Sequence, residues 1–166
     1  SIDIIPGALL FVVSNRMDVQ TTRNIADFVD CIDRDLANTF LEIVPSYGSI
    51  MVIYDNSVMS TNEVAYLLSD TWKRTLLTSR HNTAAITTID VVYGDTVGDD
   101  LTNVSDVSGK SVEEVITLHG SVTYTVGAVG FSPGFTYLIG LPPEIATPRR
   151  SSPRLRVPAG SVGIGG

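Results

Sequence analysis

The final stretch of the chain, residues 130–166, restricts the possible folds more than any other part of the sequence. It holds most of the eight prolines and half of the fourteen glycines, in the run GFSPGFTYLIGLPPEIATPRRSSPRLRVPAGSVGIGG. Proline lacks a backbone N–H and fixes φ, and glycine loses much conformational entropy on folding, so neither residue sustains a long helix. We therefore expect turns, rigid loops and short strands in this stretch.

The same stretch concentrates positive charge. Residues 145–166 hold four of the eleven basic residues and no acidic residue, whereas residues 1–144 hold all eighteen acidic residues. These four, called here the C-terminal arginines, are Arg149, Arg150, Arg154 and Arg156. Guanidinium groups on rigid loops suit the recognition of carboxylate or phosphate. The alternative is a loop-rich edge of a β-barrel on which the arginines only increase solubility.

Two amphipathic helices are predicted in the first half of the chain. From Thr22 onwards, apolar residues recur at the i, i+3, i+4, i+7 spacing of one helix face. This stripe comprises Ile25, Phe28, Val29, Ile32 and Leu36. A capping box of Ser60 and Glu63 opens the second helix. Its apolar stripe comprises Val64, Leu67, Leu68 and Trp72.

Four strands are predicted around these helices. They are expected at residues 8–13, 41–44, 50–54 and 86–93, the middle two being joined by a turn at Tyr47 and Gly48. The resulting order, β-α-β-β-α-β, is that of a ferredoxin-like unit. We therefore predict an α+β protein whose first domain covers residues 1–80.

A polar segment separates this unit from a predicted second domain. Residues 78–83 (TSRHNT) are the expected boundary, and His81 is interpreted as a solvated linker residue. The second domain is then expected to cover residues 84–166.

The second domain is predicted to begin with two short helices. One is expected to be capped by Asp99 and stopped by Gly109, and the other to open with the capping box of Ser111 and Glu114. Strands are expected at residues 122–129 and from residue 155, with a glycine- and aromatic-rich loop at 131–141.

Composition argues against several classes of function. A net charge of −7 disfavours nucleic-acid or anionic-membrane binding, which needs a dominant basic surface. No apolar run reaches eighteen residues, and one cysteine with two histidines offers no soft metal site. The sequence has no phosphate-binding (Walker) loop, nucleophile elbow or dinucleotide fingerprint. The lone cysteine, Cys31, cannot form an internal disulfide, so we expect a cytoplasmic protein.

Three runs, GFSPGFTYLIGLP, ATPRRSSPR and RVPAGSVGIGG, resemble the signature of one protein family. This is the family of allophanate hydrolase subunit 1, the B subunit of 5-oxoprolinase and the Kip-type inhibitor of a sporulation kinase. The runs VPSYGSIMVIYD at 44–55 and SVEEVITLHGSVTYTVGAVGF at 111–131 fit it as well. The resemblance implies a cyclophilin-like β-barrel in the second domain. Family members continue past the last residue of this chain, so the barrel at residues 84–166 is expected to be incomplete.

The resemblance also implies amide-bond chemistry in a multi-subunit assembly. It implies a non-autonomous subunit of an ATP-dependent amide or lactam hydrolase, such as 5-oxoprolinase, which opens 5-oxoproline to glutamate. Allophanate hydrolase and urea carboxylase are the related alternatives. The implied partners are a homologous second subunit, similar to allophanate hydrolase subunit 2, and a lactam-hydrolase-like subunit. ATP is expected to be used by the complex, with no cofactor bound by this chain and a small anionic or amide substrate.

The resemblance directs attention to a set of candidate site residues. Guanidinium groups and backbone N–H groups stabilise the oxyanions through which such reactions pass. The predicted substrate-binding residues are Tyr137, Arg149, Arg150, Arg154, Gly160 and Ser161. His119 is the predicted catalytic residue, as a proton-transfer group, because it falls in the LH pair of the family. Alternatively, His119 only interacts favourably with the dipole at the end of its helix.

Two other roles stay open. The Kip-type member of the family binds and inhibits a sensor histidine kinase. For such a regulator, Phe131, Phe135 and Tyr137 would line a protein-binding groove, although they equally fit stacking on a small ligand or packing under the loop. The third role is an inactive subunit that scaffolds the site of its partner.

Overall fold

The computed structural model describes residues 2–78, 85–94 and 97–165, which form two compact units. The first unit takes in the described part of residues 1–84 together with Thr125–Ile139, and the second takes in the described remainder. His81 and most of the predicted boundary at 78–83 lie outside the described residues. The division into domains at 1–80 and 84–166 therefore stays a prediction.

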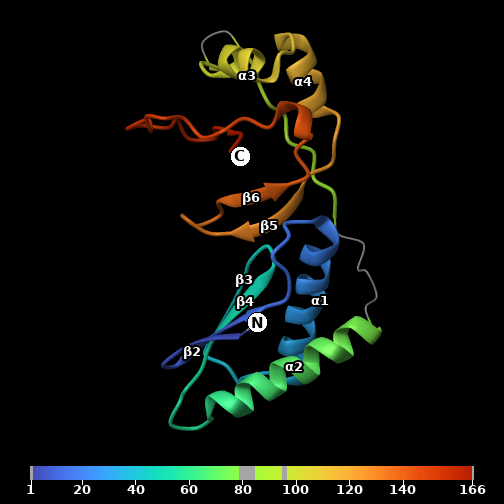
Figure 1. The fold of residues 1–166 in the computed structure, drawn as a ribbon, viewed down its shortest axis with the longest axis vertical. Helices are drawn as coiled ribbons and strands as arrows, with labels where there is room; N and C mark the ends of the chain where they lie inside the picture. Colours follow the sequence, from blue (N-terminus) through green and yellow to red (C-terminus); the bar gives the residue numbers. More distant parts are fainter. Residues whose placement is uncertain (1, 79–84, 95–96, 166) are drawn as a thin grey trace. The chain divides into compact units, whose positions relative to one another are not determined.

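The first unit is built on a four-stranded antiparallel sheet of order β1-β2-β4-β3 (Figure 1). The strands are β1 Ile2–Ile5, β2 Ala8–Val12, β3 Glu42–Pro45 and β4 Ser49–Ile53. In the central pair, Leu9 lies opposite Val52 and Phe11 lies opposite Ile50. Because side chains alternate between the faces of a strand, these four buried side chains share one face of the sheet.

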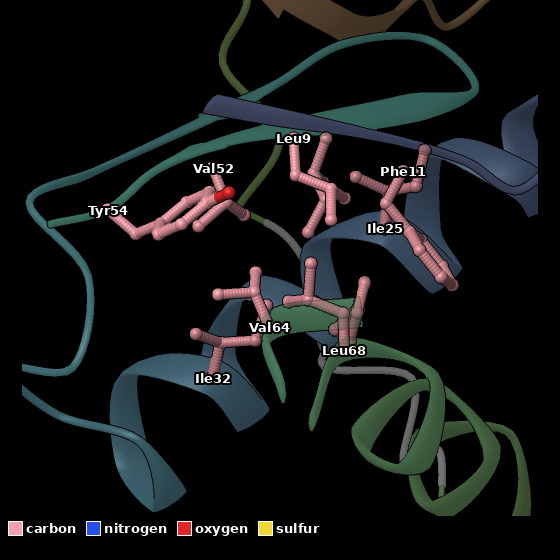
Figure 2. Close-up of a cluster of buried hydrophobic side chains, with 10 residues drawn as sticks. Leu9, Phe11, Ile25, Ile32, Val52, Tyr54, Val64 and Leu68 are labelled. Carbon is pink, nitrogen blue, oxygen red and sulfur yellow. The ribbon is translucent and has the colours of Figure 1, made fainter. Parts of the chain in front are cut away.

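Two helices, α1 Val19–Asp35 and α2 Thr61–Thr78, supply the other side of the core. Figure 2 shows side chains of the strands meeting side chains of the helices. The buried core consists of Leu9, Phe11, Ile25, Phe28, Ile32, Ile50, Val52, Tyr54, Val64 and Leu68. The stripes predicted for both helices are confirmed, since their remaining members Val29, Leu36 and Trp72 pack against this core and Leu67 is half-buried.

Both helices begin at a side-chain cap. The Asp18 carboxylate accepts hydrogen bonds from the Thr21 backbone N–H at 2.8 Å and from the Thr21 hydroxyl at 2.7 Å. This cap starts α1 at Val19, three residues before the predicted start. The predicted capping box of α2 is confirmed: Ser60 N donates to Glu63 Oε2 at 2.8 Å, and Glu63 N donates to Ser60 Oγ at 3.4 Å.

The strand predicted at residues 86–93 is wrong. No strand forms within the described residues 85–94, where Ile86 is 80% and Ile89 74% exposed. The edge of β2 at which such a strand would pair is occupied by β1, which joins β2 through a tight turn with Gly7 at φ 76. Over residues 2–78 the order is therefore β-β-α-β-β-α, and the predicted order β-α-β-β-α-β is wrong.

A second, two-stranded sheet of β5 Thr125–Val129 and β6 Thr136–Ile139 belongs to the first unit. The predicted strand at 122–129 therefore starts three residues late, and part of the predicted loop at 131–141 is a strand. The register shifts between Val126 and Ala128, where a Cβ on Gly127 would lie 2.6 Å from the Tyr47 ring. The glycine thus lets the hairpin approach Tyr47 closely.

The regular elements of the second unit are helices, within its described residues. It contains α3 Leu101–Ser108, α4 Val112–Gly120 and the 3₁₀ turn η1 Pro143–Ile145, with Val115 and Ile145 buried. The predicted stop of α3 at Gly109, with φ 66, and the capping box that opens α4 are both confirmed. The strand expected from residue 155 does not form at residues 155–165.

The α+β class is confirmed by these elements. The described residues contain two small antiparallel sheets and no closed barrel, because β5 and β6 pair only with each other. None of the helices in the described ranges has the length and apolarity needed to cross a bilayer.

Candidate functional site

His119 lies in the last turn of α4 and contacts two tyrosines. The Tyr93 hydroxyl oxygen lies 2.5 Å from His119 Nδ1, and the two rings meet edge to face with centroids 5.7 Å apart. The Tyr124 hydroxyl donates to the His119 carbonyl oxygen at 3.0 Å, and its ring centroid lies 5.4 Å from the imidazole. All three side chains are half-buried. The fold thus gives the predicted catalytic histidine two aromatic neighbours. His119, Tyr93 and Tyr124 are called here the His119 cluster.

Burial sets the charge state of the His119 cluster. It lowers the pKa of His119 below its usual value of 6.5 and raises the pKa of Tyr93 above its usual value of 10.0. The pKa of Tyr124 is also raised, mainly by burial and further by Tyr93. At neutral pH the imidazole is therefore uncharged and both phenols keep their protons. Such a cluster can donate or accept a hydrogen bond without carrying a charge.

Two of the C-terminal arginines form ion pairs with carboxylates at the start of α3. Arg154 Nη1 lies 2.8 Å from Asp99 Oδ2, and Arg154 Nη2 lies 2.8 Å from Asp100 Oδ1. Arg150 pairs with the same Asp100 oxygen. The hydrogen bond from Arg154 lowers the pKa of Asp99. Two of the arginines predicted to bind substrate thus share one pair of acidic residues.

The helix cap predicted at Asp99 is not formed. The N-cap of α3 is Asp100, and its side chain makes no capping hydrogen bond. Asp100 has φ −96 and ψ 0, rather than the extended backbone typical of a capping residue, and its carboxylate pairs with Arg150 and Arg154 instead.

These ion pairs also change the interpretation of the positive charge. The side chains of Arg150 and Arg154 are 49% and 32% exposed, so their pairs are surface ion pairs that stabilise little. Their charge is nevertheless balanced locally by Asp99 and Asp100. Arg149 is exposed and forms no ion pair within the described residues. An anionic ligand would therefore find Arg149 open but would compete with carboxylates for the other two.

The Gly160-Ser161 turn satisfies its own donors. The Ser161 backbone N–H donates to the Pro158 carbonyl at 3.2 Å, and the Ser161 hydroxyl donates to the same oxygen at 2.8 Å. Gly160 adopts φ 82, which glycine takes without strain. The predicted role of this turn as an oxyanion donor stays a prediction, and in this conformation the Ser161 N–H already has an acceptor.

Tyr137 lies on β6, which belongs to the first unit, whereas the other predicted site residues belong to the second unit. Its ring meets Phe135 with centroids 5.0 Å apart and Tyr47 with centroids 6.2 Å apart. Phe135 in turn meets Phe131 at 5.6 Å. Tyr47, Tyr137, Phe135 and Phe131 thus form a row of four aromatic rings. Phe131, the last ring of the row, is 90% exposed and is not packed under the loop.

Sequence reasoning missed the partners of the predicted residues. The adjacent acids Asp99 and Asp100, immediately before a predicted helix, were the signal for a counter-charge to the arginines. Tyr124 is five residues from His119 and so could have been suggested by proximity. Tyr93 is twenty-six residues away from His119 and carries no local signal. Among the residues that the structure describes, no group of His, Cys, Asp and Glu is arranged to hold a metal ion.

Three curated relatives share one name, that of the B subunit of 5-oxoprolinase. The protein of Escherichia coli O157:H7 is 41% identical over 132 residues, covering 80% of this chain and 59% of that protein. The Haemophilus influenzae protein is 50% identical over 78 residues, covering 47% of this chain and 37% of that protein. The Bacillus subtilis protein is 36% identical over 136 residues, covering 76% of this chain and 57% of that protein. The match thus spans 59%, 37% and 57% of the lengths of these three relatives.

Solved structures extend the likeness to the fold. The crystal structure of TTHA0988 matches with a TM-score of 0.77 and 29% identity, over 96% of this chain and 30% of that one. The urea amidolyase of K. lactis matches with a TM-score of 0.51 and 12% identity, over 74% of this chain and 9% of that one, which concerns the fold alone. The family described as the carboxyltransferase domain, subdomain C and D, matches residues 4–166. This chain therefore belongs to the carboxyltransferase domain family, subdomain C and D.

Proposed function

We propose that this chain acts as a subunit of an ATP-dependent amide or lactam hydrolase complex that opens 5-oxoproline to glutamate. The observation that carries the proposal is the shared name of the three relatives, each a B subunit of 5-oxoprolinase, two of which match about four fifths of this chain. Because these relatives are named as subunits, the activity is assigned to the assembled complex and not to this polypeptide alone.

The proposed complex contains two further kinds of subunit. The family resemblance implies a homologous second subunit, similar to allophanate hydrolase subunit 2, and a lactam-hydrolase-like subunit. ATP is proposed to be used by the complex, as membership of a 5-oxoprolinase implies. The sequence of this chain has no phosphate-binding loop. The location that we propose for the complex is the cytoplasm, where ATP is abundant.

The cyclophilin-like barrel stays part of this proposal. The β5–β6 hairpin supports it, because Val126, Val129 and Leu138 are 47%, 57% and 47% exposed on strands that pair only with each other in the described residues. Apolar side chains on a two-stranded sheet gain stability when further strands cover them.

We assign the reaction centre of this subunit to the His119 cluster and to three of the C-terminal arginines, Arg149, Arg150 and Arg154. His119 is uncharged, half-buried and next to Tyr93, which suits a group that exchanges a proton or a hydrogen bond with an amide. Arg149, Arg150 and Arg154 would hold an anionic group such as the carboxylate of 5-oxoproline. Tyr137, Gly160 and Ser161 stay predicted substrate-binding residues.

The test is reconstitution of the complex. This chain, in its full-length natural form, is co-purified with the second subunit and the lactam-hydrolase-like subunit, and ATP-dependent release of glutamate from 5-oxoproline is measured. We expect turnover by the complex, none by this chain alone, and loss of turnover in His119→Gln. Thr117→Ala, on the exposed side of the same helix, is the matched control and should keep full activity. A stable complex that releases no glutamate would refute the proposed reaction, and turnover of allophanate or urea instead would assign the related one.

One observation favours the regulatory alternative. Phe131 and Phe135 are 90% and 42% exposed and lie side by side, as protein-contacting aromatic residues do. For a Kip-type regulator, the isolated chain should inhibit autophosphorylation of a sensor histidine kinase, and Phe131→Ser should relieve the inhibition. The reconstitution above distinguishes the two roles.

A further inference from the structure

We infer that Tyr93 is a positioning residue that holds His119 in the tautomer with its proton on Nε2. His119 then presents a hydrogen-bond donor to an amide carbonyl or carboxylate oxygen, instead of a base. The identity of that oxygen rests on the proposed function. The state of the imidazole ring does not, because it follows from the contacts of the His119 cluster alone.

Tyr93 and His119 share one short hydrogen bond. At 2.5 Å between Tyr93 Oη and His119 Nδ1, one of the two atoms must donate. If Nδ1–H donated, the phenol proton of Tyr93 would need another acceptor. Within the described residues, Tyr93 Oη makes only this hydrogen bond. Donation by the phenol satisfies both groups with one proton, which leaves Nδ1 unprotonated and places the ring proton of the neutral imidazole on Nε2.

Within the described residues, the His119 ring bonds to a phenol and not to a carboxylate. In a Ser-His-Asp arrangement, a carboxylate accepts from the histidine and stabilises the imidazolium that forms when the ring takes a proton. Here the contact atom is a phenol oxygen, whose proton is retained, and no acidic side chain in the described residues bonds the ring. The neutral ring is favoured, and with it a role in polarising a carbonyl. Other enzymes use neutral histidine in this way.

Two aromatic neighbours fix the orientation of the His119 imidazole. Tyr93 meets the imidazole at 80° between ring planes and Tyr124 meets it at 43°, so two aromatic rings restrict its rotation. The Tyr124 hydroxyl also ties down the His119 backbone carbonyl at 3.0 Å. Nε2 makes no hydrogen bond within the described residues and is not among their buried unpaired atoms. A donor held in a fixed direction and open at Nε2 is suited to an oxygen of the substrate.

The experiment reads the tautomer directly. Nitrogen-15 NMR of the full chain, labelled at histidine, separates a protonated from an unprotonated ring nitrogen through its chemical shift and its couplings to ring carbon-bound protons. The chain has only two histidines, so a His81→Asn variant assigns the signals of His119. At neutral pH we expect wild-type His119 to show a protonated Nε2 and an unprotonated Nδ1. A wild-type ring with its proton on Nδ1 would overturn the inference, whatever the variants do.

The variants test the part played by Tyr93. Tyr93→Phe keeps the aromatic contact and removes the hydroxyl, so the His119 signals should move to a mixture of tautomers. Tyr124→Phe is the matched control: it removes a hydroxyl from the same cluster but leaves Nδ1 bonded to Tyr93, so the tautomer should not change. An unchanged tautomer in a folded Tyr93→Phe protein would also overturn the inference.

The reconstituted complex separates this inference from the proposed function. Tyr93→Phe should lower kcat for 5-oxoproline more than it raises KM, since a misdirected donor weakens the transition state more than the bound substrate. If the complex does not act on 5-oxoproline at all, the proposed function fails while the NMR result still decides the state of His119. If the complex is active and Tyr93→Phe leaves kcat unchanged, the positioning role fails.

Discussion

Arg154 bonds to Asp99, fifty-five residues earlier in the chain, with 2.8 Å between Nη1 and Oδ2. Its second terminal nitrogen bonds to Asp100 at the same distance. The segment richest in positive charge is thereby held against the start of α3, with its charge balanced by the two carboxylates. For two of the arginines, an anionic ligand therefore competes with a carboxylate that is already bound.

Removing the competing carboxylates should strengthen anion binding. In the double variant Asp99→Asn, Asp100→Asn, the guanidinium groups of Arg150 and Arg154 lose their ionic partners and become available to a ligand carboxylate. Calorimetric titration with 5-oxoproline should show tighter binding than in the wild type. Asp106→Asn, on the exposed side of α3, is the control and should leave the affinity unchanged. Weaker binding in the double variant would mean that the carboxylates position the arginines for the ligand.

Removing the arginines should abolish anion binding with little effect on stability. Arg149 and Arg154 are exposed or half-buried at the surface, where charged side chains contribute little to the free energy of unfolding. We expect the double variant Arg149→Ala, Arg154→Ala to lose 5-oxoproline binding and to keep its thermal midpoint within a few degrees. Arg156→Ala is the control and should bind normally. A large fall in the midpoint with binding intact would make these arginines structural.

The core of the first unit should be sensitive at Phe28. Its side chain is fully buried between the rings of Phe11 and Trp72, at 5.7 Å and 5.2 Å between centroids. Phe28→Ala should lower the free energy of unfolding by about 3–5 kcal/mol, from lost burial and the cavity left behind. Phe131→Ala removes an equal side chain that is 90% exposed and should change it by only about ±0.5 kcal/mol. Urea denaturation of the two variants checks the contrast.

The free energy of unfolding should decrease as the pH falls, because of His119. Burial lowers its pKa in the folded state below the usual 6.5, so the unfolded chain binds a proton first as the pH falls. The free energy of unfolding therefore decreases from about pH 6.5 downwards, towards the lowered pKa of the folded state. His119→Gln cannot take up this proton, so its stability should depend less on pH between neutrality and about pH 5.5. Thermal midpoints of both proteins across this range measure the difference, and parallel profiles would exclude His119 as the cause.

Gly48 should not tolerate a side chain. A Cβ built at this position would overlap the Ser14 carbonyl oxygen, and this contact is with backbone rather than with a mobile side chain. The Gly48 carbonyl also accepts from the N–H groups of Val13 and Ser14, so the two segments cannot separate without loss of hydrogen bonds. Gly48→Ala should lower the thermal midpoint markedly. Gly130→Ala, where a Cβ meets nothing within 4 Å, should have little effect.

The sequence by itself determined the helices of both units and the α+β class. The apolar stripe through Ile25, Phe28 and Ile32 and the capping boxes at Ser60 and Ser111 depend on residues three or four positions apart. Such signals lie within one turn of helix, so they act before any tertiary contact forms and can be read directly. The family resemblance likewise rests on contiguous runs of residues.

Only the tertiary structure decided which edge each strand takes and which charges and rings meet. Residues 86–93 have the composition of a strand, yet β1 pairs with β2 and leaves Ile86 exposed. The pairs Arg154 with Asp99 and Tyr93 with His119 join positions fifty-five and twenty-six residues apart. Strand pairing, and contacts between side chains far apart in the sequence, depend on competition between distant segments for the same edge or surface. The physical reason is that local periodicity predicts which face of a segment is apolar but does not predict which other segment will cover that face.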